Sequence, residues 1–104
     1  MPSSKGYLEF IQDQLSGLEG VSWKAMMGEY ILCHEGKVVG GIYDDRLLVK
    51  PTASALAMLP DAPSELPYEG AKPMLLVEDV EDRERLQRLV ESVGGDLPAP
   101  RKKR

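Results

Sequence analysis

Cysteine and histidine are almost absent from this sequence, which has one of each among 104 residues. One cysteine cannot form an internal disulfide, which excludes a disulfide-stapled secreted scaffold and agrees with a reducing compartment. A single histidine cannot complete the usual set of several Cys and His ligands around zinc. No apolar run approaches the roughly 20 residues of a membrane span, and the N-terminal MPSSKGYLEF lacks the apolar core of a signal peptide. We therefore expect a cytoplasmic protein without membrane contact.

An excess of positive charge is also missing, because the formal net charge is −4. Any contact with nucleic acid would therefore need a local basic patch or a partner protein. The obvious patch is the C-terminal Arg101, Lys102, Lys103 and Arg104, which follows a stiff proline-containing lead. Two interpretations of this tail stay open: a solubilising end without a partner, or a weak electrostatic contact with nucleic acid.

The overall composition is that of an ordinary globular domain, with 42% hydrophobic and 29% charged residues. A chain of this length buries about two-thirds of its unfolded surface and folds without metals or disulfides. We predict one domain over residues 1–96, followed by a flexible tail over residues 97–104.

The stretch from Val21 to Lys50 holds the only Trp, Cys and His. Its short apolar runs are broken by Met27-Gly28-Glu29, Glu35-Gly36-Lys37 and Asp44-Asp45-Arg46, and breaks this close together are typical of antiparallel hairpins. The pattern predicts four strands, over Val21–Met26, Glu29–His34, Lys37–Tyr43 and Arg46–Lys50. The Gly40-Gly41 pair inside the third strand predicts a bulge or a close approach of a neighbouring group.

Helical periodicity flanks these strands on both sides. Ser3 and Ser4 can cap a helix that runs to about Leu18, where Gly17 and Gly20 mark its end. After the fourth strand we expect a short helix over residues 52–59, a loop over 61–72, and a buried strand over 73–78. Asp79 can cap a last helix, which ends at Gly94-Gly95. The order α-β-β-β-β-α-β-α predicts an α+β fold, a two-layer α/β sandwich with a mainly antiparallel sheet.

Catalytic and metal-binding patterns are not recognisable. Cys33 and His34 are neighbours in a predicted strand, so their side chains point to opposite faces and cannot form a dyad within one subunit. Cys33 is interpreted as a small core residue and His34 as a surface residue before a turn. The acidic pair Asp44-Asp45 suits a turn, and the acidic residues at 78–82 suit a helix N-terminus. We predict no enzyme, no cofactor and no metal site.

Polar and aromatic residues beside the sheet remain as binding candidates. A concave sheet face with apolar walls and a few convergent polar groups can bind a small anion or a peptide, although an ordinary amphipathic surface explains the same pattern. These candidates are Lys24, Tyr30, Tyr43, Lys50, Tyr68 and Lys72.

Several short motifs in their order resemble the N-terminal domain of the TfoX/Sxy family. They are Lys24-Ala25-Met26-Met27-Gly28-Glu29-Tyr30, then the glycine-turn hairpin over residues 36–43, then Leu47-Leu48-Val49-Lys50, and later Pro67-Tyr68-Glu69-Gly70 with Lys72-Pro73-Met74. The resemblance covers roughly residues 7–93 and adds Met27 and Gly28 to the candidate positions. It implies a two-layer α/β domain and brings no catalytic residue or cofactor.

The better-known members of that family regulate natural competence together with the cyclic-AMP receptor protein and carry a second, helical domain. This chain has no room for that domain, so the resemblance implies a stand-alone version. Our first hypothesis is a non-enzymatic regulatory or protein-interaction module that contacts the transcription machinery or a regulator, or associates with itself. The alternative is a small-molecule or anion-binding domain that uses the sheet face.

Overall fold

The computed structural model describes residues 4–26 and 28–98 of the chain. Its helices and strands form an α+β fold. In chain order they are α1 (Lys5–Gln14), β1 (Val21–Met26), β2 (Glu29–His34), β3 (Lys37–Tyr43), β4 (Arg46–Val49), α2 (Ala53–Met58), β5 (Ser64–Glu65), β6 (Met74–Leu76) and α3 (Arg83–Asp96).

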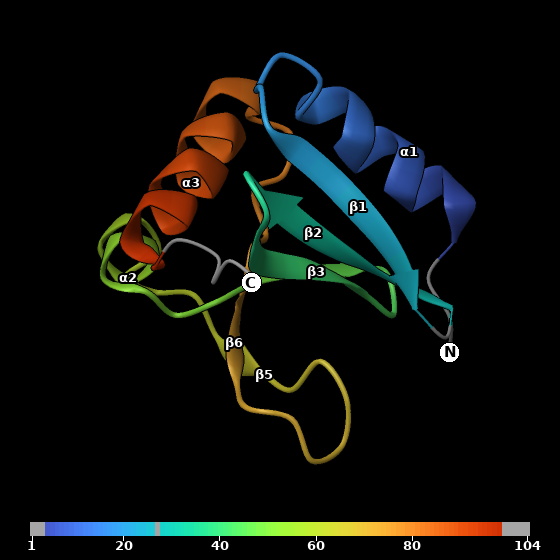
Figure 1. Ribbon diagram of the computed structural model, residues 1–104. Helices are drawn as coiled ribbons and strands as arrows, with labels where there is room; N and C mark the ends of the chain where they lie inside the picture. The colour runs from blue at the N-terminus through green and yellow to red at the C-terminus, as the bar shows by residue number, and fades with distance from the viewer. Residues whose placement is uncertain (1–3, 27, 99–104) are drawn as a thin grey trace, which may run out of the picture.

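The strands form one sheet in the order β1-β2-β3-β4-β6-β5, and every neighbouring pair is antiparallel. Helices α1 and α3 lie on the same side of this sheet, and the loop between β5 and β6 projects away from them (Figure 1). The two-layer α+β prediction is therefore confirmed. The order of elements also agrees, with the short strand β5 as an addition.

The first four strands are joined by two-residue turns, as the sequence predicts. Positive φ angles occur at Glu35 and Gly36 (53° and 83°) and at Asp44 and Asp45 (55° and 57°), as in the turns whose twist matches that of a hairpin. Gly28, in the turn between β1 and β2, has a φ of 85°. The predicted bounds of β1, β2 and β3 are confirmed, and β4 ends one residue before Lys50.

The Gly40-Gly41 pair lies where backbones approach closely. The pairing of β2 with β3 shifts between Leu32 and Cys33, which leaves Val39 as the extra residue of a bulge. A Cβ atom on Gly40 would lie 2.1 Å from the backbone oxygen of Leu48. The predicted bulge and the predicted close approach are therefore both present.

The first helix, α1, ends earlier than its sequence predicts. Helix α1 stops at Gln14 instead of reaching Leu18, although the predicted cap Ser4 does accept from the Tyr7 amide. The hydroxyl of Ser16 donates to the carbonyl oxygen of Asp13, so the Ser16 side chain satisfies a carbonyl group at the end of the helix. Leu15 has left the helical conformation but remains in the core.

Both ends of α3 also differ from the prediction. Its cap is Asp82 and not Asp79, and the Asp82 carboxylate accepts from the Arg85 amide at 3.1 Å. At the other end, the helix runs through Gly94 and Gly95 to Asp96. Gly94 packs against His34, and this contact leaves no room for a side chain at position 94. Gly94 therefore serves packing inside this helix, and the glycine pair does not end it.

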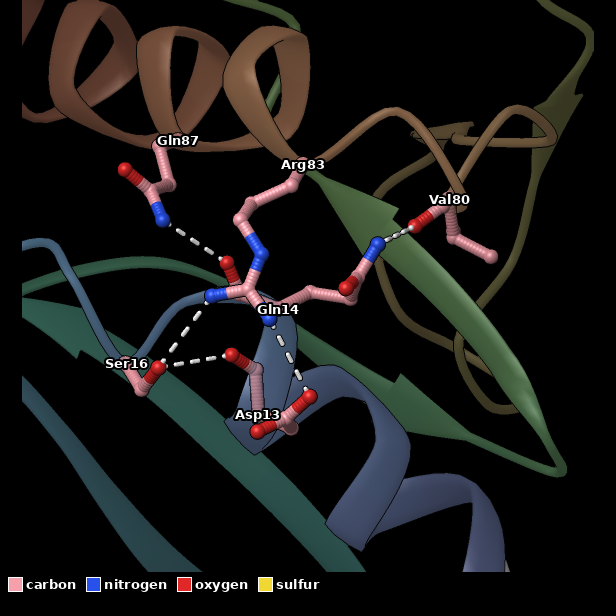
Figure 2. Close-up of polar contacts among 6 residues, drawn as sticks. All are labelled: Asp13, Gln14, Ser16, Val80, Arg83 and Gln87. Carbon is pink, nitrogen blue, oxygen red and sulfur yellow. Dashed lines mark hydrogen bonds and ion pairs between the residues drawn. The ribbon is translucent and has the colours of Figure 1, made fainter.

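Polar contacts tie the end of α1 to the start of α3 (Figure 2). The Gln14 amide, which is nearly buried, donates to the Val80 carbonyl at 2.9 Å, and the Gln87 amide donates to the Gln14 carbonyl at 2.9 Å. Arg83 donates to Asp13 at 3.2 Å and to Ser16 at 3.3 Å. The bond from Gln87 satisfies a carbonyl group that the end of α1 leaves free, and the four bonds together connect the two helices.

The main core lies between the sheet and these helices. Fully buried side chains of α1, β2, β3, β4 and α3 form one cluster, which includes Ile11, Leu32, Ile42, Leu47, Leu89 and Val90. Burial of these side chains supplies the main free energy of folding. Within residues 4–26 and 28–98, no helix combines the length and apolar character needed to cross a membrane.

Candidate functional site

The sheet face opposite the helices carries a second, smaller set of apolar side chains. Residues paired across antiparallel strands point to the same face, so Lys24, Ile31 and Gly41 share one side. We call this side the open face. It carries Lys24, Met26, Ile31, Val38, Tyr43, Leu48, Met74 and Leu76, and the same pairing places Ser22, Glu29, Cys33, Arg46 and Glu65 on this side. Tyr43, Leu48 and Met74 pack together as a separate buried cluster.

A hollow of about 510 Å³ lies on the open face. Its floor comes from the strands, and one wall comes from the segment that leads into β6. The lining residues are Met26, Ile31, Val38, Tyr43, Lys50, Pro51, Pro67, Tyr68, Ala71, Lys72, Pro73 and Met74. The volume lies within the range of about 300–1,000 Å³ that is typical of small-molecule sites.

The loop that forms this wall is anchored at its base and turned at its tip. Arg46 of β4 forms an ion pair with Glu65 of β5 and donates to the Leu66 carbonyl at 3.3 Å. At the tip, the Ala71 amide donates to the Tyr68 carbonyl at 3.1 Å, and Gly70 has a φ of 89°. The tip therefore presents Tyr68 toward the hollow.

Two tyrosines form an aromatic corner of the hollow. The rings of Tyr43 and Tyr68 are tilted by 56°, with their centroids 6.2 Å apart. Burial, together with the charge effects of Tyr68 and Glu29, raises the pKa of the Tyr43 hydroxyl above its usual value. The Tyr43 hydroxyl therefore remains a protonated hydrogen-bond donor at neutral pH. Gly41 makes room for this ring, since a Cβ atom there would lie 2.8 Å from Tyr43 Cε2.

The charge of the hollow is opposite to that of the chain. Lys50 and Lys72 are its charged lining residues, and no carboxylate belongs to the lining. Within the part of the chain that the structure describes, the ion pairs are Arg46–Glu65 and Arg83–Asp13, so neither lysine has an acidic partner there. The hollow is therefore locally positive in a chain whose net charge is −4.

The structure brings four of the predicted candidates together. Tyr43, Lys50, Tyr68 and Lys72 line the same hollow, although they come from β3, the end of β4 and the loop before β6. Lys24 shares the open face with them but lies outside the lining, on the edge strand β1.

The other candidates lie elsewhere. Tyr30 pairs with Ile42 and packs against the main core on the helix side, and Gly28 occupies the turn between β1 and β2. Met27 lies outside the described residues, as does the basic tail of residues 101–104. The prediction of nucleic-acid contact by that tail therefore stays a prediction.

The residues of the apolar floor are not among the candidates predicted from the sequence. Met26 and Val38 are 42% and 37% exposed, and Ile31 is half-buried between them in the lining. The available signal was the alternation of side chains along β2, which places apolar groups on both faces of the strand. One face of β2 belongs to the helix-covered core, and Ile31 on the other face contributes to the floor of the hollow.

Cys33 and His34 take no part in this hollow. Cys33 is 2% exposed, which confirms its interpretation as a core residue. The prediction that His34 lies on the surface is wrong, because it is 7% exposed and packs against Gly94 of α3. The residues in the described ranges contain no group of three or more His, Cys, Asp or Glu that could hold a metal ion.

Comparison with known proteins identifies the family of this chain. The TfoX N-terminal domain family matches residues 13–93, which include β1 to β6 and all but the end of α3. A protein of Spirochaeta aurantia described as "Uncharacterized 12.7 kDa protein in trpE 5'region" is 35% identical over 102 residues, covering 97% of this chain and 89% of its own length. No solved structure matches the chain with significance. With most of its residues matched, the chain belongs to the TfoX N-terminal domain family.

Proposed function

We propose that this protein is a non-enzymatic regulatory module that binds a partner protein through its open face. The partner is a component of the transcription machinery or a regulator acting on it, which is the role expected from the family. Association of two copies of the chain through the same face is the competing possibility, and the experiment below separates the two.

The observation that carries this proposal is the apolar character of the open face. Helices cover one side of the sheet, whereas Met26, Val38 and Tyr68 on the other side are 42%, 37% and 58% exposed. A contiguous apolar surface rimmed by polar groups is typical of an interaction site. It supports binding as the activity of the module.

Partner capture with variants of one exposed residue tests the proposal. Val38→Asp places a charge on the open face, and Leu56→Asp places the same charge on α2, where Leu56 is 52% exposed. We expect a protein of the transcription machinery to be crosslinked to the wild-type chain and to Leu56→Asp, but not to Val38→Asp. Equal recovery by all three chains, or recovery by none, would contradict the proposal.

Sedimentation of the same three chains addresses self-association. We expect the wild-type chain to sediment as a monomer without its partner. A concentration-dependent dimer that Val38→Asp dissociates and Leu56→Asp preserves would mean that the open face binds a second copy, and it would overturn the choice of a different protein as partner.

The hollow supports a second proposed function, binding of a small molecule or anion. The observation in its favour is the convergence of Lys50, Lys72 and the two tyrosines over an apolar floor. Apolar walls with a few convergent polar groups are the usual composition of a ligand site.

A further inference from the structure

We propose that the hollow on the open face binds an amphipathic organic anion, a small molecule with one anionic group attached to an aromatic or aliphatic body. This inference rests on the second of the proposed functions and names the ligand class. It does not require a partner protein, since the isolated chain contains the whole lining.

The shape of the hollow selects the size of the ligand. Its volume of about 510 Å³ exceeds that needed by an inorganic ion and suits an organic molecule of moderate size. Pro67 is buried at the base of the wall, and Gly70 turns the loop above it. Such a built wall defines a bounded site on the otherwise open sheet.

The charges select the sign of the ligand. Lys50 is half-buried at the end of β4 and Lys72 is exposed on the loop, so the two ammonium groups reach the hollow from different segments. No carboxylate belongs to the lining, so the charged groups that an anion meets there are the two ammonium groups. Glu29 lines the neighbouring hollow beside Tyr43 and Tyr68, so the negative charge of its carboxylate lies on the side of the tyrosines. The anionic group is therefore placed near the lysines and the body toward the tyrosines.

The uncharged lining selects the body of the ligand. Met26, Ile31 and Val38 offer a flat apolar floor, and the Tyr43–Tyr68 corner offers ring faces and edges against which an aromatic group can pack. A purely ionic ligand would leave this surface exposed to water. An uncharged ligand would leave the lysines unused.

Two fluorescent probes that differ in charge test the inference. The anionic probe is 8-anilinonaphthalene-1-sulfonate, and the neutral probe is N-phenyl-1-naphthylamine, which has the same rings without the sulfonate. Both are titrated into the folded wild-type chain and into three variants: Lys50→Met/Lys72→Met, the matched control Lys24→Met on the same face outside the hollow, and Tyr68→Ala. Circular dichroism establishes that each variant is folded.

We expect the double lysine variant to bind the anionic probe at least about tenfold more weakly, and to bind the neutral probe as the wild type does. Lys24→Met leaves both affinities unchanged, and Tyr68→Ala weakens both, which places the probes in the hollow. Restoring the charges as Lys50→Arg/Lys72→Arg recovers binding of the anionic probe.

Two other outcomes would overturn different parts of the account. If the neutral probe binds as tightly as the anionic one and the lysine variants change nothing, the hollow is a ligand site but its preference for anions is refuted. If neither probe binds the folded chain, or if Tyr68→Ala leaves both affinities unchanged, the second proposed function itself fails.

Discussion

His34, at the end of β2, packs directly against Gly94 in the last turn of α3. A Cβ atom on Gly94 would lie 2.6 Å from Nδ1 of His34 and 3.3 Å from its Cβ. This contact explains two departures from the sequence pattern together: the only histidine is buried, and the helix continues through a glycine pair.

The contact predicts opposite effects of alanine at two adjacent glycines. Gly94→Ala forces the imidazole away and lowers the free energy of unfolding by about 1–3 kcal/mol, as overpacking does. Gly95→Ala is the matched control, since nothing lies within 4 Å of its added methyl group, and it stabilises the exposed helix by about 0.5–1 kcal/mol. Urea unfolding measures both, and equal effects at the two positions would contradict the account.

Alanine in place of Gly40, at the centre of the sheet, is expected to cause a larger loss of stability. A methyl group there meets the Leu48 carbonyl oxygen at 2.1 Å and the Val49 Cα at 2.8 Å, both backbone atoms that cannot turn aside. We expect Gly40→Ala to destabilise the chain by about 3 kcal/mol or more. Gly6→Ala on α1 is the control, because no atom lies within 4 Å of the added methyl. A Gly40→Ala chain as stable as Gly6→Ala would exclude the observed pairing of β3 with β4.

A third prediction concerns pH. Asp96 at the end of α3 accepts from the Ser54 amide at 2.7 Å and from its hydroxyl at 3.0 Å, and these hydrogen bonds lower the pKa of Asp96 below 3.8. Because the folded state holds this proton less tightly than the unfolded chain, the stabilising effect is complete above the unfolded pKa and is lost as the pH falls through the folded one.

Unfolding measured from about pH 5 to pH 2 should therefore show a smaller decline of stability in Asp96→Asn than in the wild type. The amide keeps an acceptor for Ser54 but cannot titrate. A decline of the same size in both chains would assign the acid sensitivity to other carboxylates.

The turn between β2 and β3 offers a stabilising substitution. Glu35 holds a φ of 53°, which is uncommon for a residue other than glycine, whereas Asn followed by Gly is a favoured pair in this type of turn. We expect Glu35→Asn to raise the free energy of unfolding by about 0.5–1 kcal/mol. Gly36→Ala, at a φ of 83°, should lower it by about 1–2 kcal/mol. A loss of stability in Glu35→Asn would show that the glutamate side chain matters more than the turn.

The accuracy of the sequence prediction follows the range of the interactions involved. Strands β1 to β3 have the predicted bounds because turn residues such as Glu35-Gly36 act locally. The ends of the helices depend on distant partners: Gln14 bonds to Val80, and Gly94 meets His34. No local pattern contains those contacts, so the predicted ends at Leu18, Asp79 and Gly94 are wrong.

The candidate site shows the same division. Residue type singled out Tyr43, Lys50, Tyr68 and Lys72, and the fold places them around one hollow. Strand β5 was predicted as loop because its two residues lie among prolines, and it forms by pairing with β6 and through the ion pair of Glu65 with Arg46. That pairing anchors the wall of the hollow, so the site became apparent only with the tertiary structure.

The most direct test of the central claim, that the open face is the binding surface, is a backbone amide chemical-shift map during titration with 8-anilinonaphthalene-1-sulfonate. The account predicts that the shifts concentrate at the hollow, at Ile31, Val38, Lys50 and Tyr68, and leave Leu86 and Leu89 of α3 unchanged. Shifts that centre on α1 or α3, or the absence of shifts at saturating probe, would contradict it.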